Sequence, residues 1–175
     1  MAPNIQLRPC TLGDEGALSL IGQATFLETF AGVLGGQDIL SHCAAAHGTQ
    51  TYGAWLSDPN YKLWLAEIDP GSAPVGFMVI APAQLPLPDI SERDLEIKRI
   101  YLLHPFQGSG LGKRMVTAAK EHARASAADR LLLGVYANNE TAIGFYQRAG
   151  FRQLGSRKFN VGGRDYDDHI MGLSL

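Results

Sequence analysis

The sequence predicts an α/β domain built on one mixed, mostly antiparallel central sheet flanked by helices. Its 175 residues are the size of one domain, expected to span residues 1–175. Hydrophobic residues make up 46% of the chain and charged residues 18%, which supplies a core. A strand–helix–strand segment, 95–137, lies between two predicted hairpins, so both parallel and antiparallel pairing are expected.

The N-terminal part predicts one strand followed by three helical segments. Residues 5–10 form a short strand, and apolar residues then recur at helical spacing from 14 to about 30. Helical segments at 37–46 and 52–56 follow, separated by glycines and ended by Asp58-Pro59.

The middle of the chain changes to the strand period. Segments 61–68 and 75–81 flank the turn signal at 69–72 and predict an antiparallel hairpin. Three prolines exclude regular structure between 82 and 89, and a further strand is expected at 95–103.

The last third alternates helices and strands. A helix at 111–127 precedes the nearly all-apolar strand 131–137, which is typical of the centre of a sheet. A second helix is expected at 139–149, and strands 151–159 and 166–173 finish the chain around Gly162-Gly163.

Charge and composition exclude several classes of protein. There are 15 Lys and Arg against 17 Asp and Glu, so a nucleic-acid partner is not expected. Two cysteines, Cys10 and Cys43, are too few for a disulfide scaffold and are expected to be small buried residues. No signal peptide and no membrane-spanning apolar run is visible, which predicts a cytoplasmic protein without membrane contact.

The most informative segment is 103–114, which leaves a strand, turns through Gly108, Gly110 and Gly112, and enters a helix. Converging backbone N–H groups and a helix N-terminus favour a phosphate or pyrophosphate. Lys113 and Arg114 stand in the first helical turn, where a bound anion would offset their unfavourable position. A plain strand-to-helix connection is the alternative.

Two common phosphate loops do not fit this segment. The P-loop pattern requires Gly at 107, which is Gln, and Ser or Thr at 114, which is Arg. The dinucleotide pattern G-x-G-x-x-G ends on Lys113 or Val116 instead of Gly.

Another pattern does fit. Gln107-x-x-Gly110-x-Gly112, after a strand ending in His-Pro, resembles the acetyl-coenzyme A motif of the GCN5-related N-acetyltransferase (GNAT) superfamily. Residues 135–151 resemble the second signature of that family, with an Asn, an Ala three residues on, an aromatic-Tyr pair and Gly-Phe. The two motifs occur in the family's order, and the resemblance covers most of the chain. It implies the GNAT-like acyl-CoA N-acyltransferase fold.

Within the family, four segments are similar to bacterial polyamine acetyltransferases of the PaiA type. They are 26–30, 95–102, 133–135 and 166–171. This similarity is looser than that of the two motifs.

The resemblance implies that acetyl-CoA is the cosubstrate and that no metal is needed. The turn amides would hold the pyrophosphate, Gln107 would add its side-chain amide, and strand residues would pair with the pantetheine arm. Asn139 would contact the cofactor, although a plain N-cap explains it equally well. The implied binding residues are Ile100, Leu102, Gln107, Gly108, Ser109, Gly110, Leu111, Gly112, Lys113, Asn139, Ala142 and Tyr146.

Two residues are expected to carry the chemistry. The resemblance implies that Tyr146 protonates the leaving thiolate; the alternative is a buried core tyrosine. Glu96 is the candidate base, because alternation places it with Ile100 and Leu102; the alternative is a solvated charge. Some relatives that acetylate protein N-termini place a Glu where this chain has Gly134. The absence of that Glu argues against a protein N-terminus as the acceptor.

Two other groups of possible metal ligands do not predict a metal site. His42 and His47 are five residues apart and are not expected to meet on one helical face. Asp165, Asp167 and Asp168-His169 are expected to form a solvated strand face.

The predicted function is acetyl transfer to a primary amine by direct attack, with a small amine or polyamine as acceptor. A run of carboxylates between 89 and 96 is interpreted as a site mouth that draws in a polycation. Two alternatives stay open: acetylation of a protein N-terminus or lysine, and a non-catalytic acetyl-CoA-binding sensor. The sequence leaves the oligomeric state open, a homodimer included.

Overall fold

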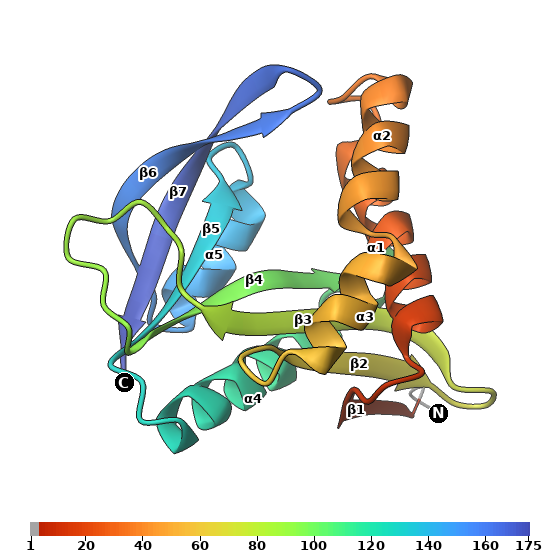
Figure 1. Ribbon diagram of the computed structural model, residues 1–175, viewed down its shortest axis with the longest axis horizontal. Coiled ribbons are helices and arrows are strands. Elements are labelled where there is room, and N and C mark those ends of the chain that lie inside the picture. Colours follow the sequence, from red (N-terminus) through yellow and green to blue (C-terminus); the bar gives the residue numbers. More distant parts are fainter. Residues whose placement is uncertain (1–3) are drawn as a thin grey trace. The chain divides into compact units, whose positions relative to one another are not determined.

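The computed structural model describes residues 4–175, and within them seven strands form one sheet of order β1-β2-β3-β4-β5-β7-β6 (Figure 1). The strands are β1 (Ile5–Pro9), β2 (Lys62–Ile68), β3 (Ala73–Pro82), β4 (Asp94–Leu102), β5 (Arg130–Tyr136), β6 (Arg152–Val161) and β7 (Arg164–Ser174). The helices are α1 (Glu15–Phe30), α2 (Gly36–Ala46), α3 (Thr49–Ser57), α4 (Leu111–Ala125), α5 (Glu140–Arg148) and the short 3₁₀ helix η1 (His104–Phe106).

The sheet is mixed, as the sequence predicts. β4 and β5 run parallel, whereas β1–β2, β5–β7 and β6–β7 are antiparallel. This arrangement with flanking helices confirms the predicted fold class. The chain falls into two compact units: unit 1 holds the residues up to Val79 and Arg99–Gly112, and unit 2 holds Ile80–Lys98 and Lys113–Leu175. That residues 1–175 act as a single domain stays a prediction.

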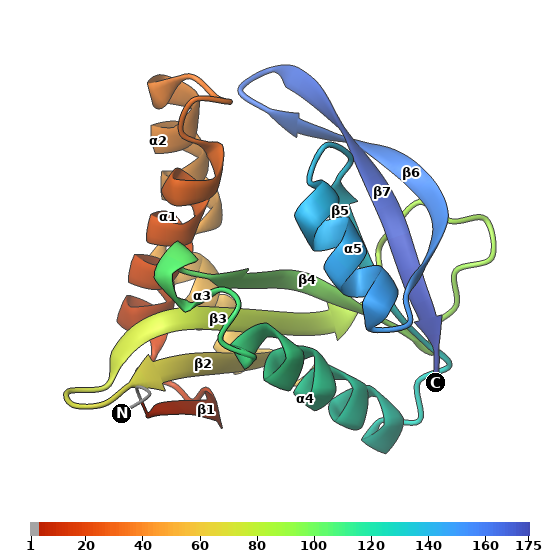
Figure 2. The same ribbon diagram turned by 180° about the vertical axis from the view of Figure 1, so that it is seen from behind.

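In unit 1, α1 and α3 pack on the face of β2 and β3, and α1 and α2 lie side by side in both ribbon views (Figures 1 and 2). The helices bury one side because their apolar residues recur at helical spacing. The core cluster consists of Leu18, Ile21, Tyr52, Leu63, Leu65, Phe77 and Val79, with Tyr101 and Leu103 at its edge. This packing fixes the C-terminal half of β4 against the helices.

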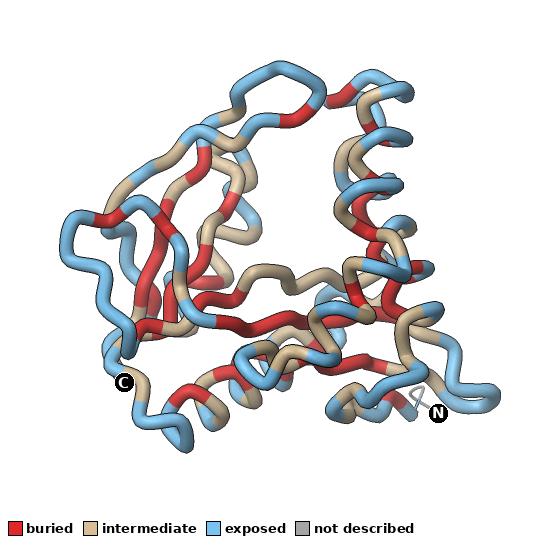
Figure 3. Tube along the Cα trace, viewed as in Figure 1, coloured by how far each residue is buried: buried red, intermediate tan, exposed pale blue. Residues whose placement is uncertain are grey.

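In unit 2, strand β5 buries Leu131, Leu132, Leu133 and Val135, and β7 and β6 continue the sheet beside it (Figure 3). The proline-rich segment after β3 has no regular structure, as predicted, yet it is not a free loop. Its Leu85 and Leu87 pack against Leu132 of β5 and Ile170 of β7. The segment therefore covers one face of the unit 2 sheet.

The predicted element boundaries differ from the structure at a few places. The segment expected at 52–56 is a longer helix, α3, which starts directly after Gly48. The predicted apolar stripe of α1 includes Thr25, which is buried, and Leu27, which is 53% exposed; Phe26, outside the predicted stripe, is buried. Cys43 is buried as expected, whereas Cys10 is only half-buried. Among the described residues no helix combines the length and the apolar character needed to span a membrane.

Candidate functional site

The glycine turn after β4 adopts the backbone conformation that its sequence requires. Gly108 has φ +76° and Gly110 has φ +85°, values that side chains other than glycine rarely tolerate. A Cβ atom added at either position would meet no atom within 4 Å, so the space beside both residues is open. The turn leaves room for a ligand to approach the backbone closely.

The amides of this turn lack acceptors within the protein. In residues 4–175 the N–H groups of Gly108, Ser109 and Gly110 make no hydrogen bond, and these residues are exposed. The Ser109 hydroxyl donates to the carbonyl of Phe106 at 2.6 Å and accepts from the N–H of Leu111 at 3.4 Å, which holds the turn in shape. The first N–H groups of α4 have no partner inside the helix. Unpaired donors at a helix N-terminus suit a pyrophosphate.

The predicted binding residues of β4 and of the start of α4 flank this turn in the chain. The Gln107 side chain donates to the Leu102 carbonyl at 3.3 Å, so its amide ties the turn to β4. Ile100 and Leu102 are half-buried in β4, and Leu102 packs against Gly76. Leu111 is buried, so its contribution to a ligand is confined to its backbone. Lys113 stands exposed in the first turn of α4.

In unit 2, helix α5 carries the residues of the second signature. Asn139 is the N-cap of α5, and its side chain accepts a hydrogen bond from the N–H of Ala142 at 3.1 Å. Tyr146 lies in the same helix, α5, and is 8% exposed. Its ring contacts Phe145 and Phe151 edge-on, with centroids 5.2 and 5.8 Å apart. Packing on both sides holds the phenol ring in one orientation.

Glu96 is not the solvated charge that the alternative reading expected. It is 5% exposed and lies opposite Leu132 in the β4–β5 register. Its carboxylate accepts from the N–H of Gln84 at 3.0 Å and lies 3.6 Å from the ammonium of Lys98. A buried carboxylate with these partners is held in place, which a positioned base requires.

The interpretation of the 89–96 carboxylates as an acidic site mouth is wrong. Asp94 is 1% exposed and forms a 2.6 Å ion pair with Arg130, which also binds Asp89 at 2.9 Å. The hydrogen bonds from Arg130 hold the pKa of Asp94 below its ordinary value, although burial opposes this. With Glu96 buried as well, this run offers little unpaired negative charge to a polycation.

As predicted, His42 and His47 do not share a helical face, yet their rings lie close together. The rings of His42 and His47 have centroids 5.7 Å apart, although the two residues are not on one helical face. They meet because α2 ends at Ala46 and His47 is its C-cap, where the chain leaves the helix. In the described part of the chain no three His, Cys, Asp or Glu side chains form a group able to hold a metal ion.

The acidic C-terminal segment is solvated only in part, whereas a solvated strand face was expected. Asp167 is exposed and pairs with Lys158. Asp168 is buried, 6% exposed, and accepts from Arg157 Nε at 3.1 Å. Burial raises the pKa of Asp168 despite that partner.

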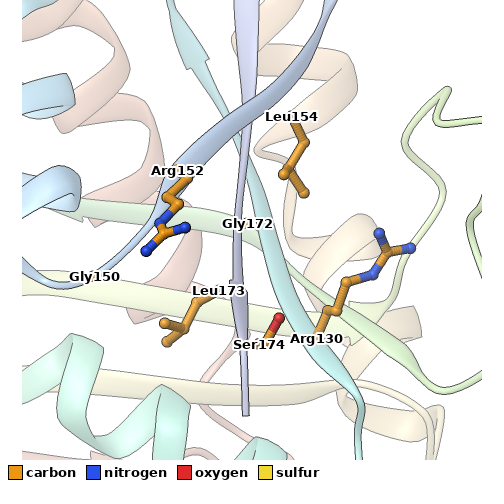
Figure 4. Close-up of a pocket in the computed structure, with 7 residues that line it drawn as sticks. All are labelled: Arg130, Gly150, Arg152, Leu154, Gly172, Leu173 and Ser174. Carbon is orange, nitrogen blue, oxygen red and sulfur yellow. The ribbon is translucent and has the colours of Figure 1, made fainter.

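A hollow elsewhere on unit 2 does not form an anion site. It is lined by Arg130, Gly150, Arg152, Leu154, Gly172, Leu173 and Ser174. Figure 4 shows the guanidinium groups of Arg130 and Arg152 on opposite sides of β7, so they do not converge on one ligand. Arg130 is in addition occupied by Asp89 and Asp94.

The comparisons with known proteins agree with this geometry. The family model described as "Acetyltransferase (GNAT) family" matches residues 36–151, which include the glycine turn and Tyr146. This match covers more than half of the chain. The chain belongs to the GNAT acetyltransferase family. It is therefore an acetyl-CoA-dependent N-acetyltransferase, and the open, unpaired amides of the turn fit that cosubstrate.

The acetyltransferase is similar to two relatives of known sequence. It is 26% identical over 155 residues to an N-acetyltransferase of the pepI 3′ region in Lactobacillus delbrueckii subsp. lactis, covering 89% of this chain and 88% of the relative. It is 38% identical to the spermine/spermidine N(1)-acetyltransferase of Bacillus subtilis, but over 65 residues, 37% of this chain and 43% of that one.

A solved structure shows the same fold. The PaiA N-acetyltransferase of Thermoplasma acidophilum, in complex with coenzyme A, superposes with a TM-score of 0.74. The superposition covers 98% of this chain and 99% of that one at 18% identity. This likeness confirms the GNAT fold of the acetyltransferase.

Proposed function

We propose that the acetyltransferase moves the acetyl group of acetyl-CoA onto the primary amine of a small molecule by direct attack. The observation that carries the proposal is the turn at Gly108–Gly110, whose N–H groups have no acceptor within residues 4–175 and whose glycines leave open space. In this proposal the turn, with Leu111, Gly112 and Lys113 at the start of α4, binds the pyrophosphate.

The backbone of β4 is proposed to orient the rest of the cosubstrate. The pantetheine arm carries amides that can pair with the main chain of Ile100 and Leu102 as an added strand does. Gln107 Nε2 donates one N–H to the Leu102 carbonyl at 3.3 Å, and its second N–H is proposed to contact the pyrophosphate. Asn139 and Ala142 are proposed to contact the cosubstrate while they cap α5.

Acetyl-CoA supplies an acyl group bonded to a good leaving thiolate. In the transfer, the carbon–nitrogen bond to the acceptor forms, the carbon–sulfur bond breaks, and the nitrogen loses a proton while sulfur gains one. Tyr146 is proposed to give that proton to sulfur. A phenol has an ordinary pKa of about 10, above the ordinary pKa of about 8.5 of a thiol, so the phenol still carries its proton when the thiolate leaves.

Glu96 is proposed to take the proton from the acceptor amine, directly or through one water. Its burial and its two polar contacts keep the carboxylate in one position on β4. The ammonium of Lys98 lies 3.6 Å from this carboxylate.

A polyamine acceptor is the second candidate. It is supported by the partial match to the spermine/spermidine N(1)-acetyltransferase and no longer by the charge of the 89–96 segment. A non-catalytic sensor has no use for Tyr146 and Glu96, and no observation favours a protein acceptor.

The test is release of free thiol from acetyl-CoA in the presence of an amine panel. The panel contains small monoamines, spermidine, free amino acids, and peptides with a free N-terminus or lysine; a reaction without amine corrects for hydrolysis. We expect thiol release with a small-molecule amine and a product whose mass is increased by one acetyl group. Tight coenzyme A binding without thiol release for any amine would contradict this proposal and favour the sensor.

A further inference from the structure

Arg99 of β4 reaches a buried pair of side chains in unit 1. Its Nη1 donates to the hydroxyl of Tyr52 at 2.9 Å and lies 3.3 Å from Nδ1 of His47. The Tyr52 hydroxyl and His47 Nδ1 are 2.8 Å apart, and both residues are at most 2% exposed. The guanidinium lies over the ring of Trp55, 4.6 Å from its centroid.

The neighbours of Arg99 are electrically neutral. A guanidinium can only donate, so His47 Nδ1 carries a lone pair and the imidazole is uncharged. Burial, with the charge of Arg99 second, lowers the pKa of His47 to about 3. Burial raises the pKa of Tyr52 to about 12, and it also lowers the pKa of His42 behind this pair.

The positive charge of Arg99 therefore has no counter-charge. Within residues 4–175 no carboxylate forms an ion pair with it, and the N–H groups on Nε and Nη2 have no acceptor. The other half-buried arginines differ: Arg8 and Arg130 each bind two carboxylates, and Arg157 binds Asp168. A half-buried guanidinium with unused donors is costly unless an anion arrives.

The position of Arg99 in β4 places its positive charge next to the strand that is proposed to bind the cosubstrate. Arg99 directly precedes Ile100, whose main chain is proposed above to pair with the pantetheine arm. Residues 99, 101 and 103 face the α1–α3 side: Tyr101 and Leu103 pack on the helix core, and Arg99 contacts Tyr52 of α3. The guanidinium is thus fixed at the surface of unit 1 beside the strand that holds the cosubstrate.

We propose that Arg99 binds a carboxylate of the acceptor, so that the acceptor is a primary amine that also carries a carboxylate, such as an amino acid. The inference rests on the proposed function and narrows its substrate class. Nε and Nη2 present the parallel N–H pair that a carboxylate binds in bidentate fashion. Stacking on Trp55 and the bond to Tyr52 orient that pair in advance, which reduces the entropy lost on binding.

The experiment compares matched acceptors that differ by the carboxylate alone. Amino acids are each paired with their decarboxylated amine, for example phenylalanine with phenethylamine and lysine with cadaverine, and kcat/KM is measured for each member. For the best pair we expect the parent protein to favour the amino acid by at least about tenfold, the value of one hydrogen bond to a charged group. Arg99→Gln should remove this preference and leave the decarboxylated amine nearly unaffected.

Two further measurements separate binding from folding. Lys62→Gln removes one positive charge from β2 of the same unit and should keep the preference. Arg99→Lys should keep part of it, and thermal midpoints show whether each variant is folded. Equal kcat/KM for both members of every pair, or an Arg99→Gln loss that is equal for both, would overturn the proposal.

A binding experiment tests the anion site independently of the proposed acetyl transfer. Calorimetry with N-acetylated amino acids and their decarboxylated counterparts measures the anion site without turnover. Binding of the acidic members that disappears in Arg99→Gln supports the site even if no amine is acetylated, a result that would reject the proposed acetyl transfer alone. If neither activity nor binding distinguishes the acidic members, the anion site is rejected.

Discussion

The carboxylate of Glu28 accepts a hydrogen bond from the backbone N–H of His104 at 2.8 Å, so helix α1 holds the start of the turn that follows β4. His104 begins η1, and the N-cap residue of η1, Leu103, provides no side-chain cap. Glu28 supplies the missing acceptor from 76 residues away. The glycine turn is thus anchored at its first residue by a long-range contact.

Glu28→Ala should loosen this anchor and weaken coenzyme A binding about two- to tenfold, the value of one modest hydrogen bond. Glu28→Gln retains a neutral acceptor oxygen and should lose less. Calorimetric affinities for coenzyme A, with thermal midpoints recorded for each variant, measure both effects. Unchanged affinity in Glu28→Ala would show that the turn holds its shape without α1.

Gly110→Val should abolish tight coenzyme A binding. Valine disfavours φ +85°, and its branched side chain would fill the open space beside the backbone. Gly163→Val is the matched control, because Gly163 has φ +77° and open space but lies in the β6–β7 turn. The control should lose stability and keep its affinity. Normal affinity in a folded Gly110→Val protein would make the turn purely structural.

The sequence predicted the elements well because each carries a local signal. The strands 131–137 and 75–81 are apolar runs, and Asn139 marks a helix start that the structure confirms as an N-cap. The glycine turn was also predictable from the sequence. Two of its positions have a positive φ, which few residues other than glycine adopt, so the turn requires glycines at those positions.

Contacts between distant residues carried no such signal. The 89–96 segment predicts exposed, unpaired carboxylates. In the structure Arg130, 36 residues beyond Asp94, pairs with the Asp94 carboxylate. Arg99 was not singled out, because its contact with Tyr52 spans 47 residues. Arg99 is one of four charged residues in β4, and its position in the sequence indicates no partner.

Gly22→Ala should destabilise the protein. A Cβ at Gly22 would lie 2.4 Å from His47 Nδ1 and 2.5 Å from the Tyr52 hydroxyl, and these two groups hold each other in place. Overpacking of this kind costs about 1–3 kcal/mol, which exceeds the helix-propensity gain of alanine.

Gly16→Ala in the same helix is the control, because a Cβ there meets nothing within 4 Å. It should stabilise the protein by about 0.5–1 kcal/mol. Urea unfolding of both variants provides the comparison. A Gly22→Ala protein as stable as Gly16→Ala would mean that the His47–Tyr52 pair moves freely.

His47 should make the folded state sensitive to acid. Its pKa is lowered to about 3 by burial, so between this value and an unfolded pKa of about 6.5 the unfolded chain binds more protons. Stability is therefore fully present above pH 6.5 and falls, by up to about 1.4 kcal/mol per pH unit, as the pH drops below it. Urea unfolding of His47→Gln should show a slope smaller by this amount between pH 7 and 5; identical slopes would place His47 in water.

Tyr146→Phe should separate an acid role from a packing role. The ring contacts with Phe145 and Phe151 depend on the shape of the ring, which phenylalanine keeps, so stability and coenzyme A affinity should change little. If the hydroxyl protonates the leaving thiolate, kcat should fall by about 10²–10⁴-fold. Tyr166→Phe, which removes a hydroxyl from β7 of the same unit, is the control and should retain its turnover. Full turnover in Tyr146→Phe would reject the acid role, because the thiolate would then leave unassisted or take its proton from water.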